Sequence, residues 1–117
     1  MNKGGVFIIS GPSGSGKDTV MTELFKKMPE AVSIFIMPPS FAELKRRLSG
    51  RGTESEELIQ KRLNSALGEI KRAVEYDYIV VNEDIAAAAD DIMSVILSSR
   101  LKTDRQTKII DEVLSEC

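Results

Sequence analysis

The sequence predicts an α/β protein built on a small parallel sheet, and three observations carry this prediction. Three short apolar runs are rich in β-branched and aromatic residues, and each ends where polar or turn residues begin. Segments with apolar residues at helical spacing lie between and after these runs. A glycine-rich turn joins the first run to the first helix. The predicted order is β-α-β-α-α-β-α, which is typical of a three-layer α/β fold.

Length and composition restrict the class of protein. A chain of 117 residues is expected to form one domain. Its residues are 42% hydrophobic and 29% charged, which is typical of a soluble globular protein. We expect no membrane partner, because no apolar run approaches the ~18 residues that span a bilayer and no signal-peptide pattern opens the chain. Sixteen basic and eighteen acidic residues give a net charge of −2, which argues against a nucleic-acid partner.

The absence of histidine removes whole classes of chemistry. Without it, Ser-His-Asp and Cys-His catalysis and the usual zinc sites are excluded. The single cysteine, Cys117, cannot form an intramolecular disulfide, and this favours a reducing, cytoplasmic location. The chemistry is therefore expected from backbone amides, lysine, arginine and carboxylates.

The three apolar runs are expected to be strands covered on both faces. They are short and almost continuously apolar, as strands of parallel sheets are. The runs are Val6–Ile9, Val32–Met37 and Tyr78–Val81.

The helices are predicted from capping residues as well as from spacing. The segment Ser40–Glu43 has the pattern of a capping box and opens a helix that extends to about Leu48. A second capping box is expected at Thr53–Glu56, ahead of a longer helix. Asp84 is expected to cap a third helix, and the tail from Asp104 is expected to form an amphipathic end helix.

The glycine-rich turn fits the phosphate-binding pattern G-x-x-x-x-G-K. Successive backbone N–H groups of such a loop form a concave anion site, and the following helix adds partial positive charge. Lys17 would then reach the β- and γ-phosphates. The alternative is a glycine-rich turn with a solvated lysine, but the preceding strand and following helix favour the phosphate site. The candidate residues are Gly11, Pro12, Ser13, Gly14, Ser15, Gly16, Lys17, Asp18 and Thr19.

Metal binding is the least regular part of this pattern. A serine or threonine normally follows the lysine and holds Mg²⁺, but this chain has Asp18 there, followed by Thr19. Asp18 could coordinate the metal, or its charge could repel phosphate. Asp18 and Thr19 are the candidate metal ligands.

Basic residues form a second candidate site. Arg51 lies in a Gly-Arg-Gly hinge, and Arg62 follows on the next helix. The two could meet on one ligand if the hinge folds over it, and arginine suits phosphoryl oxygens because it binds them bidentately. The alternative is that these side chains are solvated on helix surfaces.

Five segments also carry a family pattern, and together they resemble guanylate kinase. The resemblance extends over nearly the whole chain up to about residue 100. The run from Gly50 to Glu54, after Pro38-Pro-Ser, makes it much more specific than a phosphate-binding loop alone. The segments are Ser10–Lys17, Ile34–Ser40, Leu44–Glu57, Lys61–Leu63 and Tyr76–Asn82.

The resemblance implies a P-loop NTPase-like α/β fold with a helical lid. It also implies a kinase that transfers the γ-phosphoryl group of Mg·ATP to GMP. By resemblance, the catalytic residues are Lys17, Arg51 and Arg62, and ATP and Mg²⁺ are the cofactors. Arg47 and Asn82 are implied to lie toward the adenine end. In the family's sheet order, the three strands kept here would be neighbours.

The sequence departs from the family between about residues 30 and 31, where the family has a long GMP-binding segment and a further strand. Residues 1–103 are therefore expected to form a reduced guanylate-kinase-like domain, and residues 104–117 a helical tail. Two function classes stay open. The chain is a guanylate kinase by ancestry, or it is an ATP- or ADP-binding or protein-interaction module without phosphotransfer. An identical or different partner chain could compensate for the missing site.

Overall fold

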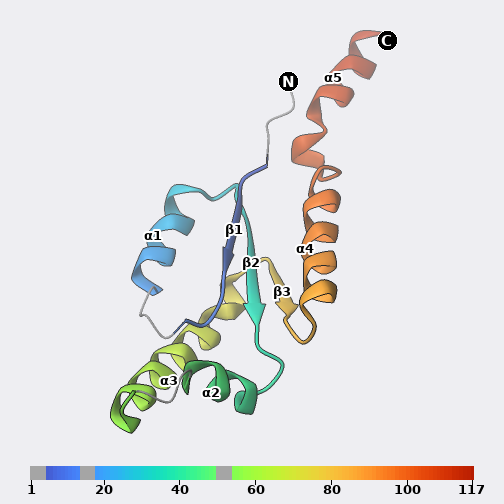
Figure 1. Ribbon diagram of the computed structural model, residues 1–117. Helices are drawn as coiled ribbons and strands as arrows, with labels where there is room; N and C mark the ends of the chain where they lie inside the picture. The colour runs from blue at the N-terminus through green and yellow to red at the C-terminus, as the bar shows by residue number, and fades with distance from the viewer. Residues whose placement is uncertain (1–4, 14–17, 50–53) are drawn as a thin grey trace.

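The structure, a computed structural model, describes residues 5–13, 18–49 and 54–117. Three strands, five α-helices and two 3₁₀ turns alternate along this part of the chain (Figure 1). In chain order they are β1 (Phe7–Ser10), α1 (Asp18–Lys27), β2 (Val32–Met37), α2 (Phe41–Ser49), α3 (Glu56–Lys71), η1 (Arg72–Glu75), β3 (Tyr78–Val81), α4 (Ile85–Ser99), η2 (Thr103–Arg105) and α5 (Thr107–Ser115).

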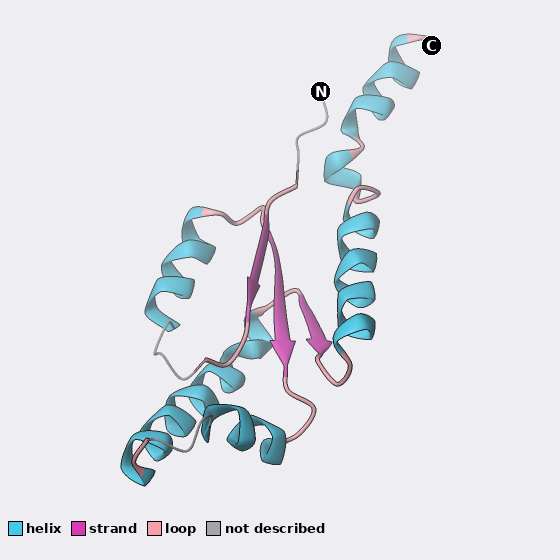
Figure 2. Ribbon diagram, in the orientation of Figure 1, coloured by secondary structure: helices cyan, strands magenta, loops and turns pink. Residues whose placement is uncertain are grey.

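The three strands form one parallel sheet in the order β1-β2-β3 (Figure 2). Phe7 pairs with Val32, and Ile34 pairs with Tyr78. The expectation that the three strands are neighbours is therefore confirmed. Because the strands are parallel, all their carboxyl ends lie at one edge of the sheet, where loops commonly form ligand sites.

Helices cover the sheet on two sides, which gives the expected three layers (Figure 1). On one face, α4 packs Ala88, Ile92 and Val95 against a core that contains Ile34 and Val80. On the other face, the rings of Phe25 and Phe35 each lie edge-on to Tyr76, with centroids 5.1 Å apart in both pairs. These ring contacts connect α1, β2 and the segment before β3.

The expectation that all three strands are covered on both faces is wrong for two of them. In β2, Val32 to Phe35 are all buried. In the outer strands, Ile9 and Ile79 are 48% and 49% exposed. The described helices therefore cover the faces of the central strand more completely than those of the two outer strands.

The predicted helix starts are confirmed at two of three capping sites. The Ser40 hydroxyl accepts the N–H of Glu43 at 3.1 Å, and the Asp84 carboxylate accepts that of Ala87 at 3.3 Å. The capping box expected at Thr53–Glu56 is wrong in register, since Ser55 is the N-cap of α3 and accepts the N–H of Leu58 at 3.2 Å.

The C-terminal part of the chain makes the molecule elongated. Its extents are 69 × 30 × 19 Å and its radius of gyration is 18.4 Å, against about 13 Å for a compact domain of this length. Arg105 holds the base of the tail, with its guanidinium 5.7 Å from the ring centroid of Phe7. Helix α5 begins at Thr107, three residues after the expected start at Asp104, and projects beyond the sheet (Figure 1).

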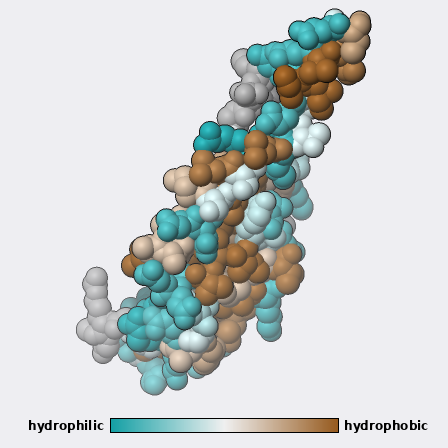
Figure 3. Space-filling model, turned by 90° about the vertical axis from the view of Figure 1, so that its right-hand side faces the viewer, coloured by the Kyte–Doolittle hydropathy of each residue, from teal (hydrophilic) through white to brown (hydrophobic). Residues whose placement is uncertain are grey.

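Apolar side chains gather along α4 and α5 on the face shown in Figure 3. The exposed large apolar residues of α4, α5 and the turn between them are Ile85, Met93, Leu97, Leu101, Ile109, Ile110, Val113 and Leu114. Among the described residues, no helix is both long and apolar enough to cross a membrane.

Candidate functional site at the carboxyl edge of the sheet

The loop that follows β1 begins the candidate site. Strand β1 ends at Ser10, and Gly11, Pro12 and Ser13 leave the sheet at its carboxyl edge. A Cβ atom added to Gly11 would lie 3.1 Å from the carbonyl oxygen of Ile36. Glycine therefore lets the loop pass close to β2, which is the close backbone approach that the sequence motif requires.

A cavity of about 420 Å³ opens between this loop and α2. Its volume lies within the ~300–1,000 Å³ typical of small-molecule sites. The lining residues come from β1 and its loop, the end of β2, and α2: Ile9, Ser10, Gly11, Pro12, Ser13, Ile36, Pro38, Leu44, Arg47 and Leu48. The wall is thus largely apolar, and its polar groups come from the loop backbone, Ser10, Ser13 and Arg47.

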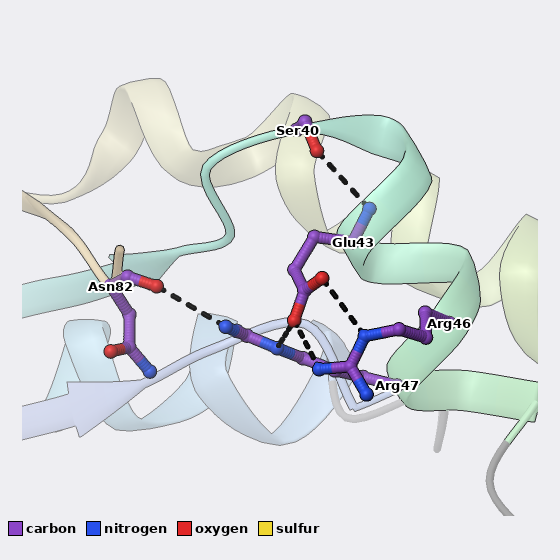
Figure 4. A network of polar contacts seen from close by, with 5 residues as sticks. All are labelled: Ser40, Glu43, Arg46, Arg47 and Asn82. Atoms are coloured by element: carbon purple, nitrogen blue, oxygen red, sulfur yellow. Dashed lines mark hydrogen bonds and ion pairs between the residues drawn. The ribbon is translucent and has the colours of Figure 1, made fainter. Parts of the chain in front are cut away.

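Arg47 connects α2 to the end of β3 (Figure 4). Its Nη2 donates to the backbone oxygen of Asn82 at 3.2 Å, and its Nε donates to Oε1 of Glu43 at 3.0 Å. The N–H of Asn82 donates in turn to the oxygen of Met37 at 2.8 Å. The guanidinium is therefore held at the cavity wall by fixed partners.

Glu43 is the acidic centre of this network (Figure 4). Its carboxylate accepts hydrogen bonds from both Arg46 and Arg47. The bond from Arg46 is the main cause that lowers the pKa of Glu43 from 4.5 to about 2, and Arg47 adds to it. The same contact with Glu43 raises the pKa of Arg46. Glu43 thus stays ionised at neutral pH and orients Arg47.

A buried carboxylate on α3 contacts the loop from the other side. Glu69 is 5% exposed, and its Oε1 accepts the N–H of Ser13 at 3.2 Å. The two residues are 56 positions apart, so only the fold brings them together. The sequence analysis missed Glu69. A signal was present, because Glu69 falls on the same helical stripe as Leu63, Ala66 and Ala73, all buried.

The predicted site residues separate into three groups. Gly11, Pro12, Ser13 and Arg47 lie together at the cavity, and Arg47 contacts Asn82. Arg62 instead pairs with Glu54, just ahead of α3. Gly14, Ser15, Gly16, Lys17 and Arg51 lie outside the described residues.

The candidate metal ligands Asp18 and Thr19 are the first two residues of α1. In the described ranges, no cluster of three or more acidic or cysteine side chains could hold a metal ion.

A parallel sheet whose first strand runs into a glycine-rich loop and then a helix defines an α/β protein of the P-loop type. The guanylate kinase family model matches residues 26–99, which is more than half of the chain. The chain belongs to the guanylate kinase family.

Individual relatives agree with this assignment. The guanylate kinase of Neisseria meningitidis serogroup A is 49% identical over 87 residues, which cover 74% of this chain and 42% of that protein. The guanylate kinase of Escherichia coli K12 is 46% identical over 94 residues, covering 80% of this chain and 45% of that protein. The chain therefore spans less than half the length of these relatives.

A solved structure matches the fold. The crystal structure of guanylate kinase from Anaplasma phagocytophilum has a TM-score of 0.62 and 21% sequence identity, with 90% of each chain covered. At this identity the match supports the α/β fold.

Proposed function

We propose that this chain binds ATP or ADP at the carboxyl edge of its sheet, with the phosphates at the loop of residues 11–17. The observation that carries the proposal is the 420 Å³ cavity that the loop residues Gly11 to Ser13 share with Arg47. Loop amides supply donors for phosphate, and α1 directs its N-terminal dipole toward the same region. Lys17 supplies a full positive charge.

Arg47 and Asn82 fit the adenine end of such a site. The family resemblance suggests this role, and the contact between the two residues supports it, because it holds the guanidinium at the cavity wall. A planar guanidinium can stack on an aromatic ring such as a purine base.

Mg²⁺ fits this site as a companion of the nucleotide. Magnesium is usually held by one or two carboxylates together with substrate phosphates and water. Asp18 and Thr19, at the start of α1, offer one carboxylate and one hydroxyl, which are the hard oxygen donors that Mg²⁺ prefers. When bound, the metal would neutralise phosphate charge.

Calorimetric titration of ADP tests the proposal. Lys17→Ala should weaken binding by about 1.5–3 kcal/mol, the range for a hydrogen bond to a charged group. Lys27→Ala is the matched control, because Lys27 is an exposed lysine at the opposite end of α1. Equal affinity for ADP in the wild type and the Lys17 variant would overturn the proposal.

Transfer of phosphate to GMP is the second candidate function, and membership of the guanylate kinase family favours it. The matched part covers only 42–45% of these relatives. By the family resemblance, the segment that grips GMP is expected between about residues 30 and 31, where this sequence has no counterpart to it. We therefore propose that the isolated chain transfers phosphate to GMP poorly, because in-line positioning of the acceptor is worth up to ~7–11 kcal/mol. A partner chain, identical or different, would have to supply the acceptor site.

A coupled ADP-release assay with and without GMP separates the two functions. A slow release that does not depend on GMP and that Lys17→Ala abolishes is expected of the binding module. GMP-dependent turnover near ~1–100 s⁻¹, the range of typical kinases, would establish the second function instead.

A further inference from the structure

Glu69 is an unusual residue for the interior of this protein. Among the described residues it is the only buried side chain that can ionise, since the other buried polar residues are Ser33 and Ser99. Burying a carboxylate costs free energy unless hydrogen bonds compensate it. A helix that needed only to pack would carry an apolar residue here, so the contacts of Glu69 are the feature to explain.

The carboxylate is directed at the phosphate-binding loop. Its Oε1 accepts the backbone N–H of Ser13, one residue before the part of the loop that the motif reserves for phosphate. A bond to a backbone N–H does not depend on which side chain the loop carries. It does depend on the path of the loop, and it therefore constrains the backbone where the loop enters the site.

Helix α3 also holds the opposite wall of the cavity. Its Leu63 and Ala66 form a buried cluster with Leu44 of α2, and Leu44 lines the cavity together with Arg47. The same helix therefore packs against the element that carries Arg47 and contacts the loop through Glu69. The position of α3 links the two sides of the site.

We infer that Glu69 is a positioning residue for the phosphate-binding loop: it acts through the Ser13 amide and sets the loop for the phosphates without touching the nucleotide. The inference rests on the proposed ATP or ADP site. It assigns a function to a side chain that the sequence motif does not include.

Three variants test this role by calorimetry with ADP and with adenosine, which lacks phosphates. Glu69→Met keeps the volume but has no strong acceptor, and Glu69→Asp keeps the charge but is one methylene too short. Both should weaken ADP binding about tenfold or more and leave adenosine binding unchanged. Glu69→Gln keeps a side-chain oxygen at the same reach and should restore ADP affinity to within about threefold of wild type. Glu57→Met, at an exposed glutamate in the first turn of α3, is the matched control.

Amide hydrogen exchange at Ser13, measured without nucleotide, gives a readout that does not depend on ADP binding. Exchange should become about tenfold faster in the Met and Asp variants and return toward wild type in the Gln variant. If the wild-type protein binds no ADP, the proposed function fails. The exchange rates then show by themselves whether Glu69 holds the loop at Ser13.

The inference is overturned if ADP affinity and Ser13 exchange both match wild type in Glu69→Asp. It is also overturned if ADP and adenosine affinities fall together with thermal stability, because that pattern indicates a purely structural role. Should Glu69→Met fail to fold, the Asp and Gln variants still give both outcomes.

Discussion

Ser33 and Asp77 hold each other by three hydrogen bonds at the start of neighbouring strands. The Asp77 carboxylate accepts the N–H of Ser33 at 2.9 Å and its hydroxyl at 3.2 Å, and the N–H of Asp77 donates to the Ser33 hydroxyl oxygen at 2.9 Å. Ser33 is buried in β2, and Asp77 comes directly before β3. The pair thus closes the end of the sheet opposite the candidate site.

Asp77→Ala should destabilise the fold by about 1–3 kcal/mol, because it leaves the N–H and the hydroxyl of a buried serine without their acceptor. Urea unfolding followed by circular dichroism measures this change. Asp91→Ala, at an exposed position of α4, is the control and should change the free energy of unfolding by less than about 0.5 kcal/mol. Equal stabilities of the two variants would contradict the role of Asp77.

The titration of Glu43 should reveal its arginine partners. Its pKa in the folded protein is about 2, below the ordinary 4.5, chiefly because Arg46 donates to the carboxylate. A lowered folded pKa stabilises the fold above pH 4.5, and this contribution is lost as the pH falls toward 2. Carboxyl ¹³C NMR should show the midpoint rising toward 4.5 in Arg46→Met, and by less in Arg47→Met. A wild-type midpoint already near 4.5 would refute the network.

Asp18 should make nucleotide binding depend on Mg²⁺. Its carboxylate follows directly on Lys17, and its charge opposes phosphate unless a metal lies between them. In EDTA, Asp18→Gly should therefore bind ADP more tightly than wild type, by roughly 1 kcal/mol. Asp18→Gly removes the charge and also makes the backbone more flexible. Asp18→Asn removes only the charge and keeps a side chain of similar size, so it shows which of the two effects changes the affinity. If neither variant improves metal-free binding, the Asp18 carboxylate does not face the phosphates.

Helix α5 should contribute little to the stability of the rest of the chain. Its main contacts are with η2, and four of its apolar residues are exposed: Ile109, Ile110, Val113 and Leu114. Removing residues 107–117 should change the free energy of unfolding by less than about 1 kcal/mol. Ile92→Ala is the contrasting change, because it cuts back an α4 side chain packed on the sheet, and it should cost about 2 kcal/mol or more. A large loss of stability on removal of α5 would show that the helix packs against more than η2.

Local patterns predicted much of the fold. The run Val32–Met37 is β2 with the expected bounds, because it lies between a proline-containing turn and a proline pair that limit a strand. Ser40 and Asp84 cap their helices as expected, since a cap depends on a side chain and an N–H three residues away. The loop at Gly11 was also predicted, because its motif is continuous in sequence.

Local sequence patterns do not predict the contacts between segments that lie far apart in the sequence. The sequence predicts the cap at Thr53, but Ser55 caps α3, and Glu54 pairs with Arg62 in the second turn of that helix. The contact of Glu69 with Ser13 spans 56 positions, and no local preference of either residue predicts it. The exposure of β1 and β3 depends on which helices pack over the faces of the sheet. Capping and strand formation depend on free energies within a few residues, whereas pairing and burial depend on which distant segments the folded chain brings together.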